Sequence, residues 1–147
     1  MTDIQKFIFL AAMILIAVVA VVFVSLILRS LKKLATLESY EVAGYKVTAI
    51  TKVVGKRKVV SFSSSVSKNN TVEKNYTYTS KNHAKEDVEG YFNYLEKNEG
   101  FSFNEALEND SKITKLSAYK LMGTAQIRVE AYYDLKGYTI CIAVEDK

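Results

Sequence analysis

Side chains that could act as metal ligands or nucleophiles are scarce in this chain of 147 residues. It contains one histidine, His83, and one cysteine, Cys141. A zinc site needs several such ligands, and a cysteine nucleophile needs a base oriented by a third group. We therefore expect His83 to be a surface residue near a helix start and Cys141 to be an unreactive residue inside a strand. A single cysteine also leaves no disulfide within the chain.

Other patterns that carry catalysis are missing from the sequence. Serines cluster at positions 61, 63, 64, 65 and 67, but none stands in the GxSxG context of a nucleophile elbow. The acidic segment NEALENDSK holds Glu105, Glu108 and Asp110 without the glycine that follows the acids in a calcium-binding loop. Neither GxGxxG nor a P-loop pattern occurs. We expect a protein that is not an enzyme and that holds no metal or cofactor.

A basic segment followed by two tyrosines is the candidate interaction surface. It consists of Lys56, Arg57 and Lys58 in GKRKVV, together with Tyr76 and Tyr78 in the next strand-like segment. Basic residues near aromatic rings are typical of surfaces that bind single-stranded nucleic acid. The same pattern fits a solvated sheet edge, where lysines discourage aggregation.

Charge and aromatic content bear on which partner this surface would take. Positions 46–85 hold nine basic residues against one acid, and positions 86–110 hold eight acids against one lysine. The net charge of the chain is only +4, which favours a protein partner or self-association over nucleic acid. The ten tyrosines have two interpretations. They pack between a helix and a sheet, or they line a surface that recognises an unknown ligand.

The amino-terminal part of the sequence predicts a membrane anchor. Residues 7–28 contain no charge, and Ser25 is the only polar side chain among them. A helix of this length spans roughly 33 Å, enough to cross a hydrocarbon core of ~30 Å. A signal peptide would have a shorter apolar region and a small-residue cleavage site. We therefore predict an uncleaved single-pass helix in the cell membrane, preceded by a short tail at residues 1–6.

Basic residues flank both ends of the predicted span. Lys6 lies before it, and Arg29, Lys32 and Lys33 lie after it. The positive-inside rule then favours a cytoplasmic location for the rest of the chain. Binding of anionic lipid by this cluster is the alternative, but lipid-recognition clusters usually hold more basic residues.

Residues 29–39 are predicted to form a basic stalk next to the membrane. Leucines recur there at three-residue spacing, namely Leu31, Leu34 and Leu37, which indicates that the helix continues for a turn or two. Such a stripe could be a dimer seam, although it is shorter than a coiled coil requires.

Residues 40–147 are predicted to form one soluble α+β domain with the order βββ-α-βββ. Alternating apolar residues in TAQIRVEAYYD and YTICIAVE predict half-buried strands. YKVTAITKVV, KVVSFSSSV, VEKNYTYTS and KITKLSAYKLM are strand-like, and FSFNEAL is a further short strand candidate. The segment HAKEDVEGYFNYLEKNEGF changes to helical periodicity, so we expect an antiparallel sheet with one helix packed on one face.

Two turn positions carry specific expectations. Asn82 is the expected cap of the helix, and Gly100 is expected to end it. Gly137 lies between the last two strands, where a positive φ would close a short hairpin.

Residues 76–101 resemble a pattern in small bacterial proteins of unknown function. In those proteins a YxY strand precedes an acid-rich helix of the form EDVxxYxxYL with a Gly-Phe exit, which this chain matches from Tyr76 to Phe101. The resemblance implies a membrane-tethered or lipoprotein-like module, and it implies a domain outside the cytoplasm, against the charge rule.

The function that these features favour is a membrane-anchored, non-catalytic protein-interaction domain, such as an accessory subunit of a membrane assembly. The alternative is a ligand-binding or envelope-sensing module that uses a tyrosine-rich surface. Nucleic-acid binding and catalysis are more distant alternatives.

Overall fold

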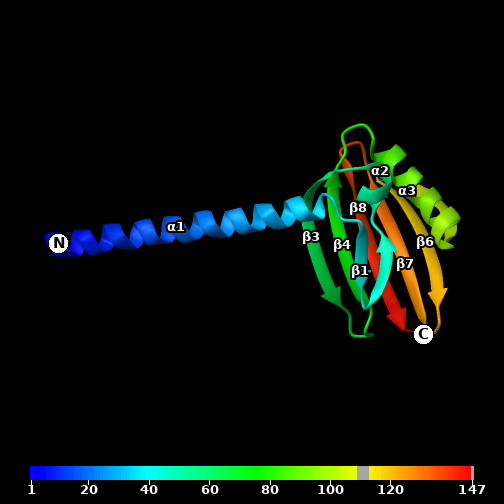
Figure 1. Ribbon diagram of the computed structural model, residues 1–147, viewed down its shortest axis with the longest axis horizontal. Helices are drawn as coiled ribbons and strands as arrows, with labels where there is room; N and C mark the ends of the chain where they lie inside the picture. The colour runs from blue at the N-terminus through cyan, green and yellow to red at the C-terminus, as the bar shows by residue number, and fades with distance from the viewer. Residues whose placement is uncertain (109–112, 147) are drawn as a thin grey trace.

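The computed structural model describes residues 1–108 and 113–146, and it joins a long amino-terminal helix to a small domain (Figure 1). Helix α1, Asp3–Leu34, is 32 residues long and has no buried residue. Within the described part of the chain, it is the one helix long and apolar enough to cross a membrane. The predicted span, residues 7–28, lies inside α1.

The two ends of α1 carry ordinary helix signals. Thr2 and Gln5 form a reciprocal capping box, in which the Thr2 amide donates to Gln5 Oε1 at 2.9 Å. Lys32 and Lys33 lie in the last turn, where positive charge complements the helix dipole. The helix ends at Leu34, before the end of the predicted stalk at residue 39.

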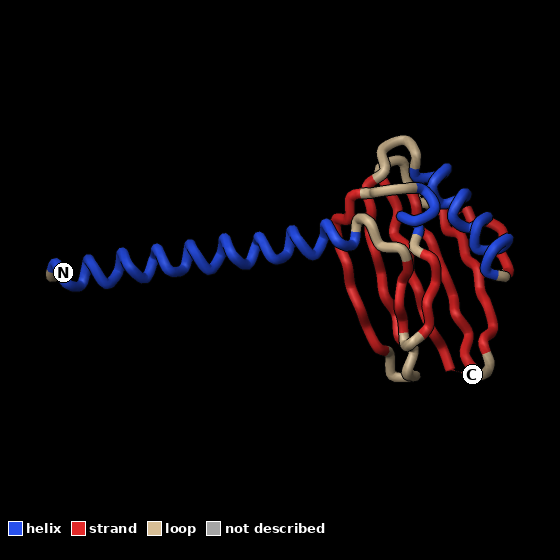
Figure 2. The backbone as a smooth tube through the Cα atoms, in the orientation of Figure 1, coloured by secondary structure: helices blue, strands red, loops and turns tan. Residues whose placement is uncertain are grey.

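A six-stranded antiparallel sheet with the order β3-β4-β8-β7-β6-β5 forms the centre of the domain (Figure 2). Its strands are β3 (Lys58–Val66), β4 (Val72–Thr79), β5 (Ser102–Glu108), β6 (Thr114–Met122), β7 (Ala125–Tyr133) and β8 (Gly137–Asp146). The predicted α+β class is confirmed, as is a strand at FSFNEAL. Strand β3 coincides with the strand-like segment KVVSFSSSV.

One face of this sheet is covered by helices and a hairpin (Figure 1). Helix α3, Ala84–Glu99, lies on this face and ends at Gly100, whose φ of 73° is left-handed as expected for a helix stop. Its apolar residues are buried at the predicted positions, namely Ala84, Val88, Tyr91, Phe92 and Leu95. The 3.6-residue periodicity therefore identified this helix and its packing face correctly.

The segment before the sheet differs from the prediction of one strand over residues 45–54. It forms a hairpin of β1 (Ser39–Val42) and β2 (Tyr45–Thr48), followed by the short helix α2 (Ile50–Val54). The β-branched residues of ITKVV favour a strand by propensity alone. Here Ile50 and Thr51 are buried, and the Ile50 amide donates to the buried Tyr40 Oη at 3.3 Å, so tertiary packing decides the local structure.

The carboxyl end of α1 is attached directly to the domain. Leu31, Leu34 and Leu37 are partly buried against the domain core, so the leucine stripe proposed as a dimer seam packs within its own chain. Three hydrogen bonds reinforce this contact: Arg57 N to Ala35 O at 3.3 Å, Ala49 N to Glu38 O at 3.0 Å, and Thr51 Oγ1 to Leu37 O at 2.6 Å. The segment predicted as a stalk, residues 29–39, is therefore a packed junction between α1 and the domain.

Both turn expectations near the start of α3 and β8 need correction. His83, not Asn82, occupies the cap position of α3, and Asn82 instead adopts a positive φ of 62°. The β7–β8 turn is closed by Asp134, whose Oδ1 accepts from the amides of Lys136 at 2.7 Å and Gly137 at 3.1 Å. Gly137 has no positive φ. It is needed because a Cβ there would overlap the Tyr78 carbonyl oxygen.

We predict that Gly137→Ala destabilises the domain by about 1–3 kcal/mol, because the backbone of β4 must move away from β8. The matched control is Gly90→Ala, at an exposed position of α3 where an added Cβ meets nothing within 4 Å. This control should increase stability by up to about 1 kcal/mol through helix propensity. Urea unfolding of the full chain in detergent, followed by near-ultraviolet circular dichroism of the tyrosines, measures both effects. Equal stability of the two variants would contradict the close contact.

Candidate functional site

The two tyrosines of the candidate interaction surface lie in the core. Tyr76 is 4% exposed and Tyr78 is 1% exposed. The Tyr76 ring packs 4.5 Å from that of Tyr40, and the Tyr78 ring packs 5.4 Å from that of Tyr138, measured between centroids. The expectation that Tyr76 and Tyr78 belong to an exposed surface is therefore wrong, because the apolar side of β4 faces the covering helices and hairpin.

These buried tyrosines satisfy their hydroxyl groups within the core. The Tyr40 and Tyr78 hydroxyl groups are 2.7 Å apart, and the Tyr91 hydroxyl donates to the Thr48 carbonyl oxygen at 2.7 Å. Burial raises the pKa of Tyr40, Tyr78 and Tyr91. Their phenols therefore stay neutral at physiological pH and serve the packing between helix and sheet.

Of the three basic residues, Arg57 has a structural contact. Its Nε lies 2.7 Å from Asp87 Oδ2 and its Nη2 lies 2.9 Å from Asp87 Oδ1, which makes a bidentate ion pair. Asp87 also accepts from Ser80 Oγ at 2.8 Å and from the Tyr138 hydroxyl at 3.1 Å. Lys56 and Lys58, on either side of Arg57, are exposed.

The Asp87 carboxylate is 5% exposed, so its charge depends on these donors. Burial raises the pKa of Asp87, but the hydrogen bonds from Arg57 and Ser80 outweigh burial and leave this pKa below its ordinary value. The hydrogen bond to Asp87 raises the pKa of Arg57 in turn. We call this group of Arg57, Ser80, Asp87 and Tyr138 the Asp87 cluster. It links α3 to the end of β4, to β8 and to the start of β3.

The opposite face of the six-stranded sheet carries no covering element among the described residues (Figure 2). Strand alternation places Arg128, Glu130 and Tyr132 of β7 on this uncovered face, beside Lys115 and Tyr119 of β6. The structure therefore presents a broad polar surface that the sequence-based search for sites did not select. The signal was present in the sequence as the polar half of each alternating strand.

Charged side chains on the uncovered face are paired with one another. Glu130 Oε2 lies 3.4 Å from Lys115 Nζ and accepts from the Tyr132 hydroxyl at 2.8 Å. Arg128 Nη1 donates to Glu145 Oε1 at 2.6 Å, and Arg128 Nε lies 3.0 Å from Glu130 Oε1 without hydrogen-bond geometry. These pairs hold their side chains in place. Tyr119 and Tyr132 remain about one-third exposed beside them.

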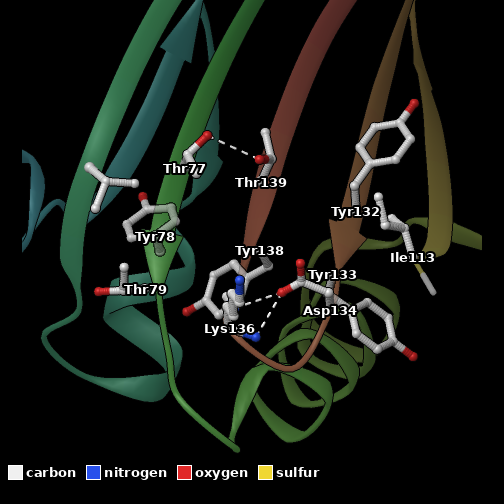
Figure 3. A pocket seen from close by; sticks show the side chains of 12 residues that line it. Thr77, Tyr78, Thr79, Ile113, Tyr132, Tyr133, Asp134, Lys136, Tyr138 and Thr139 are labelled. Atoms are coloured by element: carbon white, nitrogen blue, oxygen red, sulfur yellow. Dashed lines mark hydrogen bonds between the residues drawn. The ribbon is translucent and has the colours of Figure 1, made fainter.

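A hollow of about 310 Å³ opens on this face near the β7–β8 turn (Figure 3). Thr77 and Thr139 form its floor, with their hydroxyl oxygens 3.0 Å apart, and Tyr132 and Ile113 stand at its side. Tyr78 and Tyr138 also border the hollow, but their rings are buried on the other side of the sheet. The hollow combines hydroxyl groups with apolar walls.

The single histidine and the single cysteine lie where the sequence predicted, one on the surface and one inside a strand. His83 is exposed, with its Nδ1 3.5 Å from Glu86 Oε2. Cys141 is buried, and burial together with Glu73 raises its pKa to about 12, so the thiol is protonated at neutral pH.

Lys6 lies 3.6 Å from Asp3 in α1, whereas Arg29 is exposed near the other end of that helix. Within the described residues, no group of three or more His, Cys, Asp or Glu residues could hold a metal ion. The acidic segment NEALENDSK lies partly outside the described residues, with Asp110 among those left out.

Comparison of the chain with protein families, curated proteins and solved structures gives no match.

We predict that Asp87→Asn destabilises the domain by about 2 kcal/mol at pH 7, because the charge-assisted bonds to Arg57 are lost. The cost is moderate because the Arg57 side chain is 27% exposed and can be hydrated. The lowered pKa of Asp87 means that its stabilisation is present above about pH 4 and is lost as the pH falls through the folded-state pKa.

Urea unfolding of the full chain in detergent between about pH 2 and pH 7 tests this prediction. The stability difference between the wild type and Asp87→Asn should shrink toward acid pH. Glu89→Gln is the control, because Glu89 pairs on the exposed side of α3 with Lys85 at 3.8 Å and should matter little. A constant difference at all pH values would mean that the Asp87 charge does not provide the stabilisation.

Proposed function

We propose that this protein is a single-pass, membrane-anchored, non-catalytic domain that binds a protein partner through the uncovered face of its sheet. The partner would belong to the same membrane assembly. The observation that carries the proposal is the uncovered face itself. It is a surface in which two exposed tyrosines flank paired charges, beside a hollow that can seat a partner side chain.

The chemistry of this face supports protein binding. Tyrosine is enriched in protein interfaces because it offers a large contact area at a low entropic cost. Tyr119 and Tyr132 flank the paired charges formed by Arg128, Glu130 and Lys115. Ordered charges of both signs can select a partner of complementary pattern and disfavour others.

The anchor supports action at a membrane. Residues 7–28 of α1 are apolar, lie in a helix and are exposed over their whole length, as expected of a segment that is surrounded by lipid. The basic residues after this segment support a cytoplasmic location for the domain.

Photo-crosslinking in cells tests the uncovered face. A photoreactive phenylalanine analogue placed at Tyr119 or at Tyr132 should form a covalent adduct with one defined protein. The matched control is Tyr94, a partly buried tyrosine of α3 on the covered side of the sheet. Mass spectrometry of the adducts distinguishes a different partner from a second copy of this chain. Adducts from Tyr94 but from neither position of the uncovered face would contradict the proposal.

Topology provides an independent test of the anchor. We expect a reporter that is active only in the cytoplasm to be active when fused after Lys147, and a reporter that is active only outside to be inactive. Replacing Arg29, Lys32 and Lys33 by glutamine should shift part of the population to the opposite orientation, because the positive-inside signal is removed. Activity of the outside reporter in the wild type would instead favour the lipoprotein-like placement that the sequence resemblance implies.

A further inference from the structure

The junction between α1 and the domain fixes how the domain stands on the membrane. Ala35 directly follows α1, is 5% exposed, and its carbonyl oxygen accepts from the Arg57 amide. The Arg57 side chain is held in turn by Asp87. A helix that is both packed and hydrogen-bonded at its end cannot swivel freely, so the direction of α1 sets the orientation of the sheet.

The sheet stands with one edge toward the membrane. In Figure 1 the strands β3, β4, β8, β7 and β6 follow one another away from the amino-terminal end of α1, in the order of the sheet. Strand β3 is therefore the edge nearest the predicted span. Each further strand lies roughly 4.8 Å beyond the last, which places β6 about 19 Å farther along the sheet than β3.

The length of α1 beyond the apolar span brings this edge close to the lipid headgroups. The six residues 29–34 follow the last residue of the span and complete α1. They cover about 9 Å. The headgroup layer on each side of the hydrocarbon core is roughly 5–8 Å thick. Strand β3 begins just after Arg57, which is bonded to the end of α1, so its start lies at the outer boundary of that layer.

The chemistry of the edge suits anionic headgroups. No acid occurs from Gly55 to Val72, whereas Lys56 and Lys58 are exposed at the start of β3 and Lys68 is exposed beyond its end. Phe62 is 45% exposed, and the neighbouring serines provide hydroxyl groups that can donate to phosphate oxygens. Lysine ammonium groups bind phosphate as point charges, and aromatic rings are favourable at a membrane interface.

We infer that Lys56 and Lys58, just before and at the start of the edge strand β3, extend the basic cluster of Arg29, Lys32 and Lys33 into a site that binds the phosphate groups of anionic phospholipids in the membrane that holds α1. This inference rests on the proposed anchoring by α1. A second contact of this kind fixes the domain against the membrane surface. The same geometry disfavours a partner strand at this edge, because the domain would have to lift away from the headgroups to admit one.

A single-tryptophan series in vesicles tests the inference, since the natural chain contains no tryptophan. The full chain carrying F62W reports on the β3 edge, L121W reports on β6, and F23W reports on insertion of α1. Phe23 and Leu121 are exposed, so each of these positions tolerates an indole ring. The vesicles contain phosphatidylcholine alone or with phosphatidylglycerol, plus a lipid with a nitroxide on its headgroup or a bromine on its acyl chain.

We expect F23W to be quenched by the brominated chains, F62W to be quenched several-fold more strongly by the headgroup nitroxide than L121W, and this difference to increase with phosphatidylglycerol. Lys56→Gln together with Lys58→Gln should remove the increase. Lys81→Gln together with Lys85→Gln, which removes the same charge from two exposed lysines, one just before α3 and one in its first turn, should leave the increase in place.

Two failures are distinguishable. If F23W is not quenched by brominated lipid, α1 does not insert, and the proposed anchoring fails together with this inference. If F23W is quenched but F62W behaves like L121W, the anchor stands and the inference is wrong. The inference is also wrong if the quenching of F62W does not change with phosphatidylglycerol or with the lysine substitutions. It is wrong again if F62W is shielded from aqueous acrylamide but is not quenched by lipid, because protein would then cover the edge.

Discussion

The contact between Arg57 and Asp87 is the interaction on which the arrangement of the molecule depends. A buried carboxylate is costly unless donors surround it, and Asp87 has four such hydrogen bonds, from Arg57, Ser80 and Tyr138. Through them α3 is tied to β8 and to the end of β4. Because the Arg57 amide also donates to the Ala35 carbonyl oxygen, the same residue connects this cluster to the end of α1.

The local features of the fold could be predicted from the sequence. The period-2 alternation of β7 and β8 and the helical period of α3 each arise from an element that buries one face, whereas the uncharged run of α1 is recognised by its length and composition. The short helix α2 could not be predicted in this way. Its residues favour a strand, and the contacts that accompany the helix, from the Ile50 amide to the Tyr40 hydroxyl and from the Thr51 hydroxyl to the Leu37 carbonyl oxygen, leave no mark in the local sequence pattern. The need for glycine at position 137 could not be predicted locally either, since it comes from the close approach of the Tyr78 carbonyl oxygen on another strand.

Contacts between residues far apart in the sequence also limited the prediction of the candidate site. Arg57 and Asp87 are 30 residues apart, and no local pattern pairs them, so Arg57 looked like one of three equivalent surface charges. Part of the charge segregation along the sequence serves a contact within the domain, because an arginine of the basic segment pairs with an aspartate of the acidic segment. For Tyr76 and Tyr78 a signal was present. They alternate with threonines in YTYT, and that alternation already placed both rings on one face of a strand.

An edge-on sheet gives the two proposed surfaces different directions. If β3 lies along the headgroups, the uncovered face stands roughly perpendicular to the membrane plane, and Tyr119 and Tyr132 point parallel to the bilayer. A partner anchored in the same membrane can then reach this face by lateral diffusion, because the face is open to the side and is not turned toward the membrane. The packed junction matters for this encounter, because a flexible stalk would let the face sample many directions, whereas a fixed one reduces the orientational entropy lost on binding. Under the proposed function, the order of the strands, the packed end of α1 and the position of the exposed tyrosines together set the direction in which the uncovered face points.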